Sequence, residues 1–260
     1  MMRLYFLTWC VMFSFKLLSI ILILLVTLIA GGYPFLKKLK TRTGTAFPIG
    51  EALASGVFLG AGLIHMLGDA SQGFSELGLQ YPVAFLLAGS AFLVLLLLEH
   101  IGREIYEHED QASMSFAVLA VVMLSIHSFL VGTALGLSAS WSIAIIILLA
   151  ILAHKWAASF ALAVQINRSR LSIRAGMALF SVFALMVPLG VLIGGVVQHG
   201  LHDVPWLEPA LTALSAGTFL YLGTLHGLER SVMVKRCCNL QHFFFVIIGF
   251  ALMAVVAVWV

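Results

Sequence analysis

Charged side chains are scarce in this chain, in which Asp, Glu, Lys and Arg make up only 10% of the 260 residues. Hydrophobic residues make up 62%, and the mean hydropathy is +1.11. Water-soluble domains carry about 25% charged residues, so this composition excludes them and predicts a chain that lies in a lipid bilayer. The net charge of +3 gathers in no patch that resembles a nucleic-acid-binding surface, and we expect no nucleic-acid partner.

Cysteine is also rare, and the three that occur (Cys10, Cys237 and Cys238) form no disulfide framework. We expect free thiols. The N-terminal segment has no Ala-x-Ala cleavage pattern, so residues 1–16 are predicted to be a short, surface-lying preface to the first membrane span rather than a cleaved signal.

The long apolar runs lack the period-two alternation of a transmembrane β-barrel. LLSIILILLVTLIA and AFLVLLLL are unbroken, and only helices satisfy the backbone of such runs in lipid. About 20 residues cross a hydrocarbon layer of about 30 Å. We therefore predict an all-α, polytopic membrane protein, a single domain over residues 1–260 with eight transmembrane helices, near 17–36, 48–68, 82–102, 114–138, 141–165, 175–197, 208–228 and 241–260.

Basic residues are confined to alternate predicted loops, which hold 11 of the 14 Lys and Arg residues. The intervening loops hold none. Because cytoplasmic loops carry the Lys and Arg, both termini are predicted on the non-cytoplasmic side. We favour the plasma (inner) membrane, and a homodimer is left open.

Two histidines interrupt consecutive apolar segments, His127 in IHSFLVGTALGL and His154 in ILAHKWAASFALAV. Each lies about 13 residues into its span, which places it near the bilayer midplane at about 1.5 Å per residue. Pro188 lies at the same depth, where a proline frees a backbone carbonyl. A lone intramembrane His can simply join two helices by a hydrogen bond, and such a Pro can be only a kink. Their coincidence at one depth favours a functional site.

The second span carries several polar residues along one helix face, whereas the fourth and fifth spans each carry a single histidine. Glu51, Ser55, Phe58, Gly62, His65 and Asp69 follow one another at steps of three or four residues and share one helix face. His65 and Asp69 form the better pair, because a carboxylate orients an imidazole; we predict that they capture metal at the outer mouth. Alternatively, each acid only begins or ends its helix.

The cytoplasmic ends of two spans hold further candidates. His226 and Glu229 lie one turn apart near the end of the seventh span, and with Glu51 they are predicted to line the exit. A solvated pair at the membrane interface is the ordinary alternative.

Several segments together resemble the ZIP (ZRT, IRT-like) metal-ion transporters. They are GVFLGAGLIHML, HSFLVGTALGL, HKWAASFAL, MVPLGVLIGG and AGTFLYLGTLHGLE. The resemblance implies eight helices, both termini outside, and a transport site between helices four and five. By it, His127 and His154 fall on metal-binding positions. His65 and Asp69 fall where several members carry a His and an acid implicated in metal capture.

The chain departs from the family pattern where carboxylates are usual. Val131 stands four residues after the fourth-helix His in place of a Glu, and apolar residues stand at two further acid positions, Ala158 and Val187. The resemblance therefore implies one metal, not two. Zn²⁺ wants four ligands, and Ser128, a carbonyl freed near Pro188 and waters are the candidates to join the two imidazoles.

Lys155 is an ammonium predicted at the membrane centre, about 100° around the helix from His154. It either lines the cavity or pairs with an acid. By the resemblance it stands near a second-metal position, and our hypothesis is that it acts there as a tethered cation.

We predict a divalent metal transporter that moves its substrate toward the cytoplasm by alternating exposure of the His127 and His154 site. Imidazole suits Zn²⁺, Cu²⁺, Ni²⁺ and Fe²⁺, whereas lack of carboxylate disfavours Mg²⁺, Mn²⁺ and Ca²⁺; zinc is the first choice, chiefly from the resemblance. Val131 prompts the alternative of a transport-inactive metal sensor or partner subunit. A membrane metalloenzyme is less favoured, because no HxxxH or HExxH cluster occurs.

Overall fold

The computed structural model describes residues 2–36, 47–105, 109–138, 140–169, 171–197, 204–225 and 240–258. This part of the chain is helical apart from short connections and contains no strand. The all-α prediction is confirmed. Six helical stretches within these ranges are long and apolar enough to cross a membrane, which is the mark of a polytopic membrane protein.

The helices follow the order of the predicted spans. They are α1 (Met2–Leu36), α2 (Pro48–Gly60), the π-helix η1 (Ala61–Met66), α3 (Leu67–Glu76), α4 (Val83–Ile105), α5 (Glu109–Leu137), α6 (Trp141–Arg168), α7 (Ile173–Val197), α8 (Leu207–Tyr221) and α9 (Leu240–Val256). The segments α2, η1 and α3 form one unbroken helical stretch of 29 residues. Residues 222–225 continue α8 as a π-turn.

Residues 2–16 do not form a separate segment, because α1 begins at Met2 and runs for 35 residues. At about 1.5 Å per residue such a helix is about 52 Å long, well beyond the roughly 30 Å of hydrocarbon. The stretch with the hydropathy of a span begins at Val11. The predicted surface preface is therefore a straight continuation of the first span in the structure.

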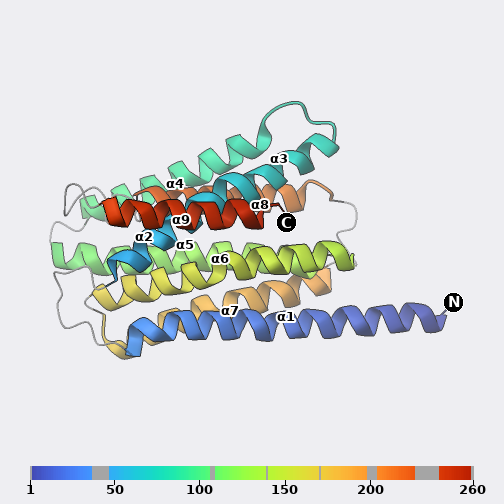
Figure 1. Ribbon diagram of the computed structural model, residues 1–260, viewed down its shortest axis with the longest axis horizontal. Helices are drawn as coiled ribbons and strands as arrows, with labels where there is room; N and C mark the ends of the chain where they lie inside the picture. The colour runs from blue at the N-terminus through green and yellow to red at the C-terminus, as the bar shows by residue number, and fades with distance from the viewer. Residues whose placement is uncertain are drawn as a thin grey trace.

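The helices divide into two groups that lie side by side (Figure 1). In the first group, α5 packs most extensively on α7, and α1 packs on α6 and α7. In the second group, α2 packs on α9, and α8 packs on α3 and α4. Figure 1 shows the first group in the lower half of the view and the second in the upper half.

Glycines bring the helices of the first group into backbone contact. A Cβ atom on Gly132 of α5 would lie 2.5 Å from the carbonyl oxygen of Val187, and one on Gly190 of α7 would lie 2.3 Å from that of Phe129. Gly136 and Gly194 repeat this contact one turn further along. Glycines of α5 and α7 thus form the surface that joins these two helices.

The second group uses the same device. A Cβ on Gly249 of α9 would lie 2.2 Å from the carbonyl oxygen of Leu53, and one on Gly217 of α8 would lie 2.2 Å from that of Ala88. A buried polar contact adds to the α4–α8 packing, because the Tyr221 hydroxyl donates a hydrogen bond to the Glu99 carboxylate.

Contacts between the two groups are less extensive and come mainly from α2 against α6 and α8 against α5. We call the end of the bundle that holds Leu36, Pro48 and Arg168 the inner end, because the predicted basic loops attach there, and the opposite end the outer end. The polar face of the second span lies at this interface between the groups, since its residues line two cavities there.

Candidate metal pathway

His127 on α5 and His154 on α6 lie together at the interface, both buried. Their ring centroids are 5.8 Å apart, and the ring planes cross at 68°. Depth alone placed the two residues at one level; the packing of α5 against α6 also turns them toward each other. The structure therefore brings this predicted pair together.

Phe219 of α8 covers both imidazoles. Its ring stacks on His127 with centroids 4.0 Å apart and meets His154 edge-on at 5.0 Å. On its other side it packs against Phe58 of α2, again at 5.0 Å. Phe219 is not among the site residues predicted from the sequence. It lies in the apolar run AGTFLYLG, where nothing distinguishes it from a residue that only packs.

The ring nitrogens of the two histidines have few partners. Nδ1 of His127 lies 3.5 Å from the Thr218 hydroxyl, whose proton is donated to the Ser215 carbonyl at 2.7 Å. Because the Thr218 hydroxyl proton is directed at Ser215, the Thr218 oxygen faces Nδ1 of His127 as an acceptor. Nδ1 of His154 is buried and has no hydrogen-bond partner in the described ranges.

Among the described residues, Lys155 has a hydroxyl and an aromatic ring as its partners and no acid. Its ammonium donates a hydrogen bond to the Ser128 hydroxyl at 2.9 Å and lies 3.9 Å from the centre of the Phe183 ring. The side chain is buried and lines neither of the two cavities described below. Both predicted placements of Lys155 are replaced by a third, in which a hydroxyl and an aromatic face receive the charge.

Pro188 does not break α7, which is helical from Ile173 to Val197. The proline is buried, and its neighbour Val187 lies against Gly132 of α5. Val131, at the position where the family pattern has an acid, lines the larger of the two cavities described below. No three His, Cys, Asp or Glu side chains come together in the part of the chain that the structure describes, so carboxylates do not complete the histidine pair there.

A cavity of about 480 Å³ runs from the outer end of the interface to His154. It is enclosed by residues of η1 and α3 on one side, of α5 and α6 on another, and of α8 on a third. Its polar lining comprises His65, Asp69, Gln72, Glu76, His154, Glu208, Thr212 and Ser215. Carboxylates and imidazoles thus share the lining of this cavity.

His65 and Asp69 stand together inside this cavity. Nδ1 of His65 lies 2.9 Å from Oδ2 of Asp69, with the imidazole nearly buried and the carboxylate half exposed. The π-helix η1 carries His65, and such single-turn π segments recur at functional sites. Glu208 at the start of α8 faces the same cavity. Glu208 is not among the site residues that the sequence predicted.

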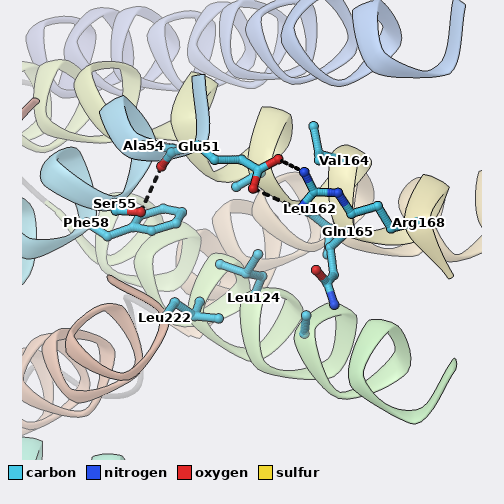
Figure 2. Close-up of a pocket in the computed structure, with 12 residues that line it drawn as sticks. Glu51, Ala54, Ser55, Phe58, Leu124, Leu162, Val164, Gln165, Arg168 and Leu222 are labelled. Atoms are coloured by element: carbon cyan, nitrogen blue, oxygen red, sulfur yellow. Dashed lines mark hydrogen bonds and ion pairs between the residues drawn. The ribbon is translucent and has the colours of Figure 1, made fainter. Parts of the chain in front are cut away.

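The inner end of the interface holds a much smaller cavity, about 60 Å³ (Figure 2). Glu51 lines it, but the carboxylate accepts two hydrogen bonds from Arg168, of which Nη1 to Oε2 measures 2.8 Å. Ser55 and Gln165 line it too. The other predicted exit residues, His226 and Glu229, lie outside the described residues.

The amino-acid sequence matches the model of the ZIP zinc transporter family over residues 13–116 and 109–257. The zinc transporter 11 of Arabidopsis thaliana is 28% identical, over 95% of this chain and 85% of the relative. The mouse zinc transporter ZIP2 is 27% identical, over 79% and 83%. The zinc transporter ZIP1 of Takifugu rubripes is 26% identical, over 92% and 96%. With a family match over nearly its whole length, an all-helical bundle and paired intramembrane histidines, this chain belongs to the ZIP family of zinc transporters.

Proposed function

We propose that this protein carries a divalent transition metal, zinc first, across a membrane toward the cytoplasm. The ZIP family is one of transporters and not of enzymes, so a membrane metalloenzyme is set aside. The observation that carries the proposal is the outer cavity, which ends at one of two buried imidazoles that lie 5.8 Å apart.

His127 and His154 are the ligands in this proposal. An imidazole binds Zn²⁺ at about 2.0–2.1 Å through an unprotonated nitrogen, and a His127 whose Nδ1 donates to the Thr218 oxygen would offer Nε2 in that form. Ser128 is a weak third ligand, because a hydroxyl that accepts from Lys155 keeps a second lone pair. A carbonyl near Pro188 and waters complete the shell. A site with only two strong ligands binds weakly, and transport requires that the ion can leave.

Capture at the outer end falls to His65 and Asp69. Their cavity would concentrate cations, since Asp69, Glu76 and Glu208 all line it and, among the described residues, no Lys or Arg does. Release at the inner end falls to Glu51, together with His226 and Glu229. Alternating exposure follows from the asymmetry of the two cavities. In this conformation His154 borders the outer cavity, and the Phe58–Phe219 pair separates the histidines from the inner one.

The test is zinc uptake into proteoliposomes by the native chain and by His127→Ala and His154→Ala. The expected result is uptake near background for both variants, because each loses half of the strong ligands. His100→Ala is the matched control, since His100 is a well-exposed histidine on α4, and we expect uptake at the native level.

Equal uptake by all four proteins would remove the site assignment. No uptake by well-folded native protein would instead favour a transport-inactive metal sensor or partner subunit, the reading that Val131 supports. Zinc binding measured by calorimetry separates these cases, because a sensor would bind zinc through the same histidines without moving it.

A further inference from the structure

Glu51 and Arg168 come from different helix groups and meet at the inner end of the interface. Glu51 is in the first turn of α2, and Arg168 is the last residue of α6. The guanidinium donates two parallel hydrogen bonds to the carboxylate, the geometry in which an Arg–carboxylate pair is strongest and most specific. Figure 2 shows the Glu51 carboxylate and the Arg168 guanidinium pointing at one another beside the inner cavity.

This ion pair is largely withdrawn from water. The side chains of Arg168 and Glu51 are only 21% and 12% exposed, and their neighbours in the cavity wall are mostly apolar, among them Phe58, Leu124 and Leu222. An ion pair in such surroundings attracts more strongly than one on a solvated surface. It therefore contributes to holding α2 against α6, one of the two main contacts between the groups.

The hydrogen bonds of this ion pair are incomplete. Nε of Arg168 is buried and has no hydrogen-bond partner among the described residues, and leaving such a donor unsatisfied costs free energy. The cavity beside it is closed to all but a very small volume, whereas the cavity at the outer end is eight times as large. The ion pair thus stands where the two groups must separate if the histidine site is to open inward.

We propose that Arg168 is the positioning residue that closes the inner end of the metal pathway by holding the carboxylate of Glu51. While the pair is intact, the guanidinium neutralises the carboxylate that the exit requires, and the two helix groups stay together at their inner ends. When the pair breaks, the same step opens the inner cavity and exposes Glu51 to the departing cation. This inference rests on the proposed transport function.

The experiment measures conformation without metal. In a background with Cys10, Cys237 and Cys238 replaced by serine, Ala161→Cys reports on the inner cavity and Thr212→Cys on the outer one, since these residues line the two cavities. A membrane-impermeant maleimide is applied to vesicles of each orientation. Labelling rates are compared for the native pair, Glu51→Gln, Arg168→Gln and the double variant.

Either single substitution is expected to raise labelling of the inner reporter about tenfold and to lower labelling of the outer one, because hydrogen bonds to charged groups of this kind shift a two-state equilibrium by about that factor. The double variant should match the singles, since the two residues act as one unit. Arg168→Lys keeps the charge but not the two parallel bonds, and should fall in between.

Arg174→Gln is the matched control for Arg168→Gln, and Glu104→Gln is the matched control for Glu51→Gln. Each control removes a charge of the same sign as its counterpart, from an exposed residue at the same end of the bundle. Neither should change either reporter. Unchanged reporters in Glu51→Gln and Arg168→Gln would overturn the proposal, and so would a rise at both reporters, which indicates general loosening. Zinc uptake dependent on His127 and His154 alongside unresponsive reporters would remove only the role of Arg168 and leave the transport function in place.

Discussion

Contacts inside each helix group differ from contacts between the groups. Inside the first group, Gly132 and Gly190 bring two backbones so close that a single added carbon would overlap a carbonyl oxygen. Between the groups lie two cavities, a stacked pair of phenylalanines and one partly buried ion pair. Backbone contacts tolerate no sliding, whereas side chains around cavities can repack. Packing is therefore tight inside each group and loose at the interface between the groups, where the proposed metal pathway lies.

The largest effect should come from filling the contact inside a group. Gly190→Ala places a Cβ 2.3 Å from the carbonyl oxygen of Phe129, and overpacking of this kind costs about 1–3 kcal/mol. We expect a lower melting temperature in detergent, followed by intrinsic fluorescence. Gly195→Ala is the control, because no heavy atom lies within 4 Å of its added carbon, and it should not lower the melting temperature. Equal melting of the two variants would contradict the rigid contact.

A second change introduces a carboxylate at the interface between the groups. Val131→Glu adds an acid to the wall of the outer cavity, which also reaches His154. We expect the KM for zinc uptake to fall about tenfold, about 1.4 kcal/mol of tighter binding, and the maximal rate to fall because the ion leaves more slowly. Val131→Gln has the same shape without the charge and should leave KM near the native value. A KM that stays unchanged in Val131→Glu would place this wall outside the zinc pathway.

Lys155 tests whether a buried cation inside the first group has a role in transport. Lys155→Met keeps the apolar stem and removes the contacts to Ser128 and Phe183. If the ammonium acts as a tethered cation beside the histidines, zinc uptake should fall about fivefold, the factor that about 1 kcal/mol of lost interaction produces, and Lys155→Arg should retain more activity. Native uptake by Lys155→Met would contradict the hypothesis.

The smallest effect is expected at the outer mouth. Asp69→Asn removes the carboxylate that lies 2.9 Å from His65, and a half-exposed polar contact of this kind contributes only about 0–1 kcal/mol. We expect KM to rise about twofold to threefold at low ionic strength and the effect to fade as added salt screens the cavity. Glu104→Gln, at an exposed residue of α4 that does not line this cavity, should change KM less. A salt-independent increase would indicate a structural role for Asp69.

The sequence predicted the course of the chain well because hydropathy and bilayer thickness constrain it strongly. The spans from residue 48 onward begin and end close to the helices of the structure, although α3 extends the second span to Glu76. The first span was placed too short, since nothing in the composition of residues 2–16 marks where a helix would stop. Counting residues from the span ends also predicted that His127 and His154 lie at one depth, and their rings are 5.8 Å apart in the structure.

Partner choice could not be read from the sequence, because it depends on how helices far apart in the chain turn their faces. Arg168 contributed to the sequence analysis only as one of the basic loop residues that indicate membrane orientation. In the structure it donates a hydrogen bond to Glu51 across the interface between the groups. Lys155 finds Ser128, which lies 27 residues away, and no acid. Phe219 looked like any apolar residue but touches both imidazoles. Single apolar or basic residues carry no pattern that distinguishes these roles.

The π-helix η1 also bears on how related chains should be aligned. One residue inserted into a helix turns everything after it by about 100°, so the wide turn over Ala61–Met66 sets which face His65 and Asp69 present to the outer cavity. A relative that is one residue shorter here would keep an unbroken helix and the same span length, but would aim its outer half elsewhere. Correct superposition of two such sequences therefore requires a gap in the middle of a continuous helix.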